Sequence, residues 1–222
     1  MRPGGLVIAI DGPSGAGKST AGKALAAALG YVFIDTGAMY RALALKALRA
    51  GLSLDDAERL ASLLRETRIE LVDGGRGVLL DGEDATAAIR TREMSAAASR
   101  VSTHTPVRRE MVGRQQELGR EGGVVLDGRD IGTAVFPDAD VKFYVDADPR
   151  RRAMRRRQEL QAAGVHSDLE AIEAEIRERD HLDSTRRDSP LTRAPGAAHL
   201  DTTSLAPEEV LARMLEAVRA RE

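Results

Sequence analysis

The residues with the clearest chemical potential lie near the start of the chain, where glycines, a lysine and a serine have a fixed spacing. Residues 12–19 read Gly-Pro-Ser-Gly-Ala-Gly-Lys-Ser and fit the pattern G-x-x-x-x-G-K-[ST] at every fixed position. Glycines let successive backbone N–H groups curl around an anion without an interfering Cβ atom. Lys18 can reach the β- and γ-phosphates of a nucleotide, and the Ser19 hydroxyl can coordinate Mg²⁺. The stretch predicts an ATP-type site with Mg²⁺, formed by Gly12, Pro13, Ser14, Gly15, Ala16, Gly17, Lys18, Ser19 and Thr20.

A second group of charged side chains follows an apolar stretch in the middle of the chain. Residues 123–126, Gly-Val-Val-Leu, are typical of a buried strand and run directly into Asp127. A carboxylate at the end of such a strand can face the Mg²⁺ held by the first loop, so Ser19 and Asp127 are the candidate metal ligands. Arg129 and Asp130 follow at once and place both signs of charge in the same cleft.

A third cluster is an arginine-rich segment, in which six of the eight residues 150–157 are arginine. At helical spacing Arg152, Arg155 and Arg156 share one face. Three interpretations are open: a solvated face paired with acids such as Glu159, a nucleic-acid patch, or a lid that brings cations over a transferring phosphoryl group. A net charge of −2 gives little support to nucleic-acid binding. With the lid interpretation, Arg156 is expected to bind ATP.

Composition limits the remaining possibilities. The chain has 222 residues, enough for one α/β domain that buries about 70% of the surface of its unfolded form. It has no cysteine and four scattered histidines, which excludes thiol catalysis, zinc ribbons and iron–sulfur clusters. The absence of asparagine excludes the Asn-Lys-x-Asp guanine motif of regulatory GTPases. The apolar runs are too short to span a bilayer and residues 1–5 lack the features of a signal peptide, so we expect a cytoplasmic protein.

These side chains require a parallel sheet to position them. Buried strands are predicted at residues 6–10, 31–34, 123–126 and 141–145, with a short last strand at 198–201. Helices are predicted at 21–29, 38–50, 53–65, 91–102, 107–120 and 168–183, and also after Pro149 and from Pro207. Residues 68–84 alternate in polarity around a glycine-rich turn and predict a small antiparallel sheet inserted in the main fold. The polar, charge-rich residues 179–191 are expected to form a loop.

Four sequence motifs follow one another in a characteristic order. They are Ile10–Thr20, Asp35–Arg41, Asp127–Thr133 with Phe136–Ala139, and Glu178–Asp180 with Asp183, Arg186 and Ser189–Leu191. Together they resemble the bacterial cytidylate kinase family, whose members phosphorylate CMP and dCMP from ATP. The resemblance implies an α/β P-loop kinase fold with a parallel-sheet core, an enlarged monophosphate-binding insertion and a lid. It divides a single domain into a core (residues 1–37, 103–148 and 195–222), an insertion (about 38–102) and a lid (about 149–194).

The resemblance also implies roles on the acceptor side of the site. The residues implied are Thr36, Arg41, Arg129 and Arg186 for the acceptor phosphate, Ser99, Arg109 and Asp130 for cytosine, and Arg179 and Asp183 for the ribose. The segment Ser102–Pro106 is one residue longer than is usual in the family, which leaves Arg108 as the alternative to Arg109. An aspartate accepts a hydrogen bond from the amino group of cytosine, whereas uracil presents a carbonyl there.

The implied reaction is in-line transfer of the ATP γ-phosphoryl group to the phosphate oxygen of CMP. A phosphate dianion is already nucleophilic, so the expected catalytic groups position and stabilise charge: Lys18, Arg41, Arg129 and Arg186, with Mg²⁺. The nearest alternative is a P-loop kinase for another nucleoside monophosphate or a small metabolite. The expected partners are ATP and CMP or dCMP, without nucleic acid or membrane, and the chain is expected to be a monomer.

Overall fold

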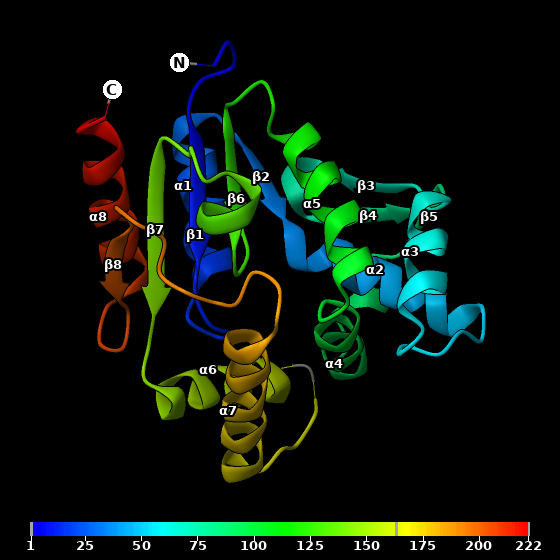
Figure 1. Ribbon diagram of the computed structural model, residues 1–222. Helices are drawn as coiled ribbons and strands as arrows, with labels where there is room; N and C mark the ends of the chain where they lie inside the picture. The colour runs from blue at the N-terminus through cyan, green and yellow to red at the C-terminus, as the bar shows by residue number, and fades with distance from the viewer. Residues whose placement is uncertain (1, 163, 222) are drawn as a thin grey trace.

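A five-stranded parallel sheet enclosed by helices forms the centre of the computed structural model, which describes residues 2–162 and 164–221 (Figure 1). The strand order is β2-β6-β1-β7-β8. The strands are β1 (Val7–Asp11), β2 (Val32–Asp35), β6 (Val124–Asp127), β7 (Val141–Asp146) and β8 (Ala198–Asp201). Every neighbouring pair is parallel, so the carboxyl ends of all five strands meet at one edge. Loops at that edge are where ligands bind in open α/β sheets.

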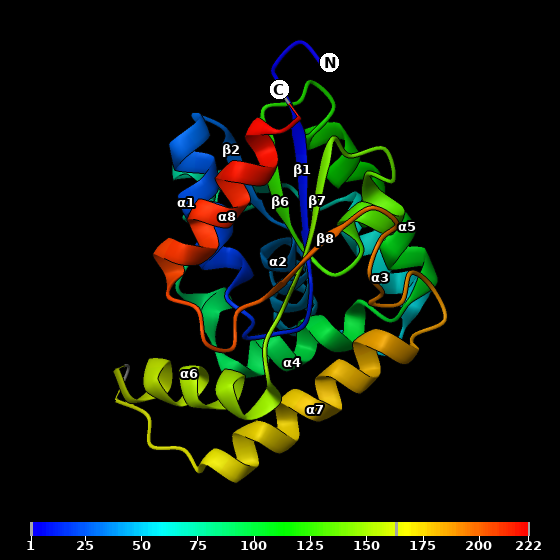
Figure 2. The same cartoon turned by 90° about the vertical axis from the view of Figure 1, so that its left-hand side faces the viewer.

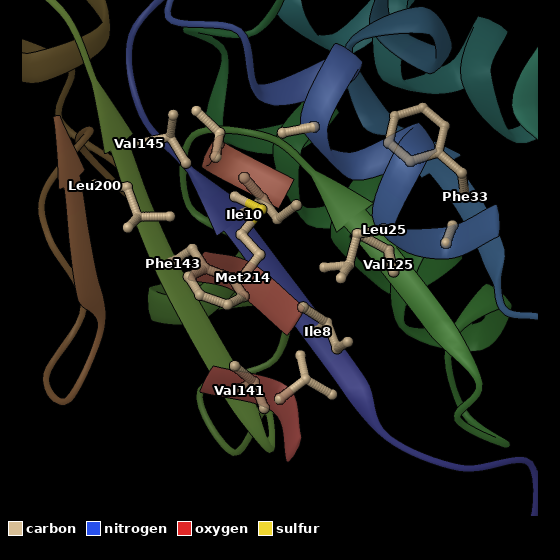
Figure 3. Packing of buried hydrophobic residues seen from close by; sticks show 14 of the residues in the cluster. Ile8, Ile10, Leu25, Phe33, Val125, Val141, Phe143, Val145, Leu200 and Met214 are labelled. Atoms are coloured by element: carbon tan, nitrogen blue, oxygen red, sulfur yellow. The ribbon is translucent and has the colours of Figure 1, made fainter. Parts of the chain in front are cut away.

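The central strand β1 is buried along its whole length because helices cover both faces of the sheet. On one face Ile8 and Ile10 pack with Leu25 of α1 (Lys18–Leu29) and Met214 of α8 (Pro207–Arg219), as Figure 3 shows. On the other face Val7 and Ala9 belong to a cluster with Leu126 and Phe136. A strand buried on both faces needs apolar residues at every position rather than alternation, which explains its continuous apolar run.

A large insertion follows β2 and carries a second core of its own. Its elements are α2 (Thr36–Arg49), α3 (Ala57–Arg65), β3 (Ile69–Val72), β4 (Gly77–Leu80), β5 (Glu83–Asp84) and α4 (Arg92–Val101), with short 3₁₀ turns at Asp73–Gly75 and Ala88–Arg90. The strands β3, β4 and β5 pair antiparallel, which confirms the small inserted sheet. Helix α5 (Thr105–Leu118) closes this unit, because Leu43, Leu60, Val101 and Met111 form one buried cluster from its four helices.

Two helices lie beyond the carboxyl edge of the main sheet, α6 (Pro149–Ala162) and α7 (Leu169–Thr185) (Figures 1 and 2). They pack on each other through Ala153, Ile172 and Ile176. The expectation that residues 179–191 form a loop is wrong for the first part, since α7 continues to Thr185. The helix is held there by Asp183, which is buried and paired with Arg129 from the sheet edge. Among the described residues, no helix is long and apolar enough to cross a membrane.

Candidate active site

The glycine-rich loop joins the end of β1 to the start of α1, and its backbone requires glycine. Gly12, Gly15 and Gly17 have φ of 144°, 77° and 90°, values that other residues rarely adopt. At Gly12 a Cβ atom would lie 1.9 Å from the carbonyl oxygen of Val145, so a larger residue does not fit. Gly17 is the residue before α1, and the free N–H groups of the helix therefore open into the loop. This is the geometry of an anion-binding site at a helix N-terminus.

Lys18 is buried next to this loop, and its amino group points back toward the loop backbone. The Nζ atom donates a hydrogen bond to the carbonyl oxygen of Pro13 at 2.7 Å and lies 3.9 Å from Oδ1 of Asp127. Burial lowers the pKa of Lys18 to about 7, and the positive charge of Arg129 contributes in the same direction. A negatively charged phosphate at this position would favour the protonated amine again.

Asp127 ends β6 and faces the first residues of α1, as the sequence predicts. Its carboxylate accepts a hydrogen bond from the Ser19 hydroxyl, and its backbone carbonyl accepts one from Oγ1 of Thr36 at 2.7 Å. Burial raises the pKa of Asp127, while the nearby Lys18 charge lowers it. A hydroxyl and a carboxylate side by side are hard oxygen ligands, the kind that Mg²⁺ prefers.

Four arginines from three different elements converge between the main sheet and α7. Arg41 lies on α2, Arg129 follows β6, Arg179 lies on α7 and Arg186 directly follows it. Asp35 and Asp183 balance part of this charge: Nη2 of Arg41 is 2.9 Å from Oδ2 of Asp35, and Nε of Arg129 is 2.8 Å from Oδ2 of Asp183.

The charge in this cluster is only partly neutralised. Burial, with the charge of Arg129 next, lowers the pKa of Arg179 to about 10. The Nε atoms of Arg41 and Arg179 are buried and have no hydrogen-bond partner within the described part of the chain. Buried guanidinium N–H groups without acceptors favour binding of an anion with several oxygens, such as a phosphate.

Asp130 is buried and is held by arginines on two sides. Its Oδ2 pairs with Arg108 of α5, and its Oδ1 lies 3.4 Å from Nη2 of Arg186. The neighbouring Arg109 lies on the exposed face of α5. Arg108, the alternative to Arg109, is therefore the residue that contacts Asp130. The helix begins at Thr105, and one residue of register turns the side chain by about 100°.

Ser99 lies on the buried side of α4, and its Oγ atom has no hydrogen-bond partner among the described residues. Ser102, one turn later, accepts a hydrogen bond at its carbonyl from Nη1 of Arg108 at 3.2 Å. Within the described residues, the end of α4 thus carries an unpartnered hydroxyl and the start of α5 a buried guanidinium that contacts Asp130.

The arginines of α6 differ in what they contact. Arg152 is buried and joins three segments: it donates to the carbonyl oxygens of Ser14 at 3.0 Å and Ala147 at 2.8 Å, and pairs with Asp180 of α7 at 2.6 Å. Arg156 pairs instead with Glu159 at 2.9 Å, one turn along its own helix. The α6 side chains next to the phosphate-binding loop are those of Arg152, which bonds Ser14, and Arg155, whose Nη1 atom would lie 3.9 Å from a Cβ atom at Gly17.

Comparison with known proteins shows the family of this chain. The family model described as "Cytidylate kinase" matches residues 8–220. The chain belongs to the cytidylate kinase family. It is 52% identical over 218 residues to the cytidylate kinase of Geobacillus kaustophilus and 50% identical over 218 residues to that of Bacillus subtilis, and each match covers 97% of both chains. An uncharacterised protein from Eubacterium ventriosum, 11% identical, has a similar fold with a TM-score of 0.51, covering 97% of this chain and 99% of that one.

In this member of the cytidylate kinase family, two buried residues make contacts that the sequence did not predict. Arg152 shares a helix face with Arg156, and the pattern gave no means of separating the two. Asp11 is the last residue of β1, and both of its carboxylate oxygens accept backbone N–H groups from the loop that carries Arg129 and Asp130. The only sequence signal for a role of Asp11 was its position in the Ile10–Thr20 motif.

Proposed function

We propose that this member of the cytidylate kinase family transfers the γ-phosphoryl group of ATP to CMP or dCMP through the residues of the site described above. The observation that carries the acceptor assignment is the buried Asp130, which lies beside a cluster of arginines with unpartnered N–H groups. The arginines suit a phosphate, and the carboxylate suits a base that offers an amino group. These two recognition elements lie at the same sheet edge as the glycine-rich loop.

The donor side consists of the loop from Gly12 to Ser19 together with Lys18. The loop N–H groups and the N-terminus of α1 would hold the β-phosphate of ATP, and Lys18 would bridge to the γ-phosphate. Ser19 and Asp127 fit a magnesium ion, since their oxygens are adjacent at the loop. When bound, Mg²⁺ neutralises charge on the β- and γ-phosphates. Arg152 links the loop to α7 through Ser14 and Asp180.

The acceptor side uses Thr36, Arg41, Arg129 and Arg186 for the phosphate of CMP, with Arg179 and Asp183 beside the ribose. A phosphate dianion needs several donors, and the Nε atoms of Arg41 and Arg179 lack acceptors in the described residues. The acceptor oxygen is already an anion, so no general base is required. The arginines would hold it in line with the γ-phosphoryl group and stabilise the charge that spreads over the equatorial oxygens.

Asp130 would determine the choice of base. A carboxylate has about four acceptor positions, and its contacts with Arg108 and Arg186 leave room for the exocyclic amino group of cytosine. Uracil would instead place a carbonyl oxygen against this carboxylate. Two facing acceptors leave a buried polar contact unmade, which can change specificity by orders of magnitude. The unpartnered hydroxyl of Ser99 is available to the same base.

The domain division is part of this proposal. The main sheet would be a fixed core, residues from about 38 to 102 would move with the acceptor, and residues from about 149 to 194 would close over both phosphates. Exclusion of water by that closure would suppress hydrolysis of ATP.

Initial rates of ADP formation with Mg·ATP and each of CMP, dCMP, UMP, AMP and GMP test the assignment. We expect fast turnover with CMP and dCMP, slow turnover with UMP and none with the purine nucleotides. Fast turnover with UMP would contradict the role given to Asp130, while turnover with AMP alone would contradict the acceptor assignment itself.

A further inference from the structure

Asp11 is a buried acid at the boundary between the two halves of the cleft, and the reaction described above gives it no role. It is the last residue of β1, it directly precedes Gly12 of the phosphate-binding loop, and its exposed fraction is only 2%. Its Oδ1 accepts the N–H of Ile131 at 2.7 Å, and its Oδ2 accepts the N–H of Gly132 at 2.7 Å. One carboxylate therefore ties the donor side of the site to a segment 120 residues later in the chain.

That segment is the loop which carries the acceptor-recognition groups. Its start is fixed by a hydrogen bond from the N–H of Gly128 to the carbonyl of Ile10, at 3.0 Å. Its end is fixed by Asp11. Arg129 and Asp130 are the two residues between these anchors, and both anchors belong to the last two residues of β1. The positions of the two recognition side chains are thus set relative to the phosphate-binding loop.

The local geometry explains why the anchor comes from another strand. Residues Ile131–Val135 form a short π-helical turn, and Asp130 occupies the position before it. An aspartate at this position usually caps the first free N–H groups of a helix with its own side chain. Asp130 makes no such bond, because its carboxylate faces Arg108 and Arg186. Asp11 supplies the missing acceptor and leaves Asp130 free to face the cleft.

The contact leaves little space for adjustment. A Cβ atom at Gly132 would lie 3.3 Å from Oδ2 of Asp11, 3.2 Å from Cδ of Lys142 and 3.1 Å from Cβ of Ala194. The backbone of the loop is therefore packed against Asp11 and cannot move toward it. A loop held in this way keeps its side chains in place before the acceptor binds.

We infer that Asp11 is a positioning residue: its carboxylate holds the loop that carries Arg129 and Asp130 in register with the phosphate-binding loop, and so sets the selectivity for the cytosine base. The inference rests on the role proposed above for Asp130. Asp11 is given no contact with either substrate, because it is buried and each of its oxygens accepts a backbone N–H group.

The test compares Asp11→Asn with a matched variant, Asp140→Asn. In Asp11→Asn one oxygen is replaced by an NH₂ group, so that two donors would face each other where a 2.7 Å hydrogen bond now forms. Asp140 makes a similar backbone contact to the opposite end of the same strand, where its Oδ2 accepts the N–H of Val7 at 2.7 Å. That contact lies far along β1 from the cleft, so its loss affects folding without moving the recognition loop.

The measurements are kcat and KM for CMP and for UMP, the dissociation constant of ATP, and the urea midpoint of unfolding, for both full-length variants. We expect Asp11→Asn to raise KM for CMP and to reduce the ratio of kcat/KM for CMP over UMP about 10- to 100-fold. The dissociation constant of ATP should change by less than about threefold, because the loop N–H groups are unaffected. Asp140→Asn should lower the urea midpoint and leave the ratio unchanged.

Two further variants separate the possible failures. If Asp11→Asn does not fold, Gly132→Ala disturbs the same contact from the loop side and should reduce the ratio in the same direction; an unchanged ratio in Gly132→Ala would overturn the inference. If Asp130→Asn keeps the preference for CMP, the base-reading site and the inference fail together. If Asp130→Asn loses the preference for CMP while Asp11→Asn keeps it, only the positioning role of Asp11 is refuted. The same conclusion follows if Asp11→Asn weakens the binding of ATP as much as that of CMP.

Discussion

Two adjacent arginines on α5 offer the sharpest test of the acceptor site. The side chain of Arg108 is 4% exposed and pairs with Asp130, whereas Arg109 lies on the exposed face of the same helix. We compare Arg108→Met with Arg109→Met, since methionine keeps an unbranched apolar stem and removes the guanidinium with its charge and N–H donors. The two variants differ by one residue of register, so any difference between them reports the direction of the side chain.

The expected loss of stability in Arg108→Met depends on the ion pair that Asp130 retains. Removing one partner of a buried ion pair costs about 3–5 kcal/mol, because it leaves the other charge without compensation. Asp130 retains Arg186 at 3.4 Å, so we expect the free energy of unfolding to fall by about 3 kcal/mol. A misplaced base-reading group costs about 1–3 kcal/mol in recognition, or about 5- to 150-fold in kcat/KM for CMP. Arg109→Met should change stability by less than about 0.5 kcal/mol and kcat/KM by less than about twofold.

The assay is coupled detection of ADP at varied CMP with saturating Mg·ATP, accompanied by urea unfolding of both variants. A loss of tenfold or more in Arg109→Met, together with a small effect in Arg108→Met, would refute the placement of α5 against the acceptor. Equal losses in both variants would show that charge on this helix acts through the general field rather than through the contact with Asp130.

The remaining predictions concern the arginines, the buried acid and the glycine loop. Arg129→Ala and Arg186→Ala should each lower kcat about 10³-fold or more while retaining a cooperative unfolding transition, because both would stabilise the transferring phosphoryl group; near-normal turnover in either would count against the mechanism. Burial raises the pKa of Asp11 to about 6 from its ordinary 3.8; the charge of Asp130 also raises it, and that of Lys18 lowers it. The folded state therefore binds a proton more tightly than the unfolded state. The free energy of unfolding thus falls as the pH rises between these two pKa values. The free energy of unfolding of the natural protein should therefore increase relative to that of Asp11→Asn as the pH falls from about 7 to about 4.5, and an opposite or absent trend in paired urea titrations would contradict the burial argument. Gly12→Ala should abolish soluble, nucleotide-binding protein because its Cβ atom would overlap the carbonyl oxygen of Val145, and thermal shift with ATP would detect any variant that escapes this outcome.

The linear sequence alone determined the chemistry of the donor side. The spacing of Gly12, Gly17, Lys18 and Ser19 requires a strand before it and a helix after it, and the structure has both as β1 and α1. A loop that binds phosphate through its own backbone is a local object, so residues close in sequence are enough to specify it. The apolar stretch that ends at Asp127 was equally informative, because a strand buried on both faces cannot alternate in polarity.

Tertiary structure alone decided which of the candidate arginines are buried and paired with the buried acids. Arg108 and Arg109 are the same residue type and are adjacent in the sequence. Only the packing of α5 against the sheet edge turns Arg108 inward and leaves Arg109 exposed. The same holds for Arg152 and Arg156 on α6, where the contacts with Ser14 and Asp180 select one of several arginines. The link from Asp11 to Ile131 joins residues 120 positions apart in the chain, and no local pattern encodes a contact over that distance. Side-chain direction and long-range pairing depend on how helices and strands pack, which is why the acceptor site could be resolved only in the folded chain.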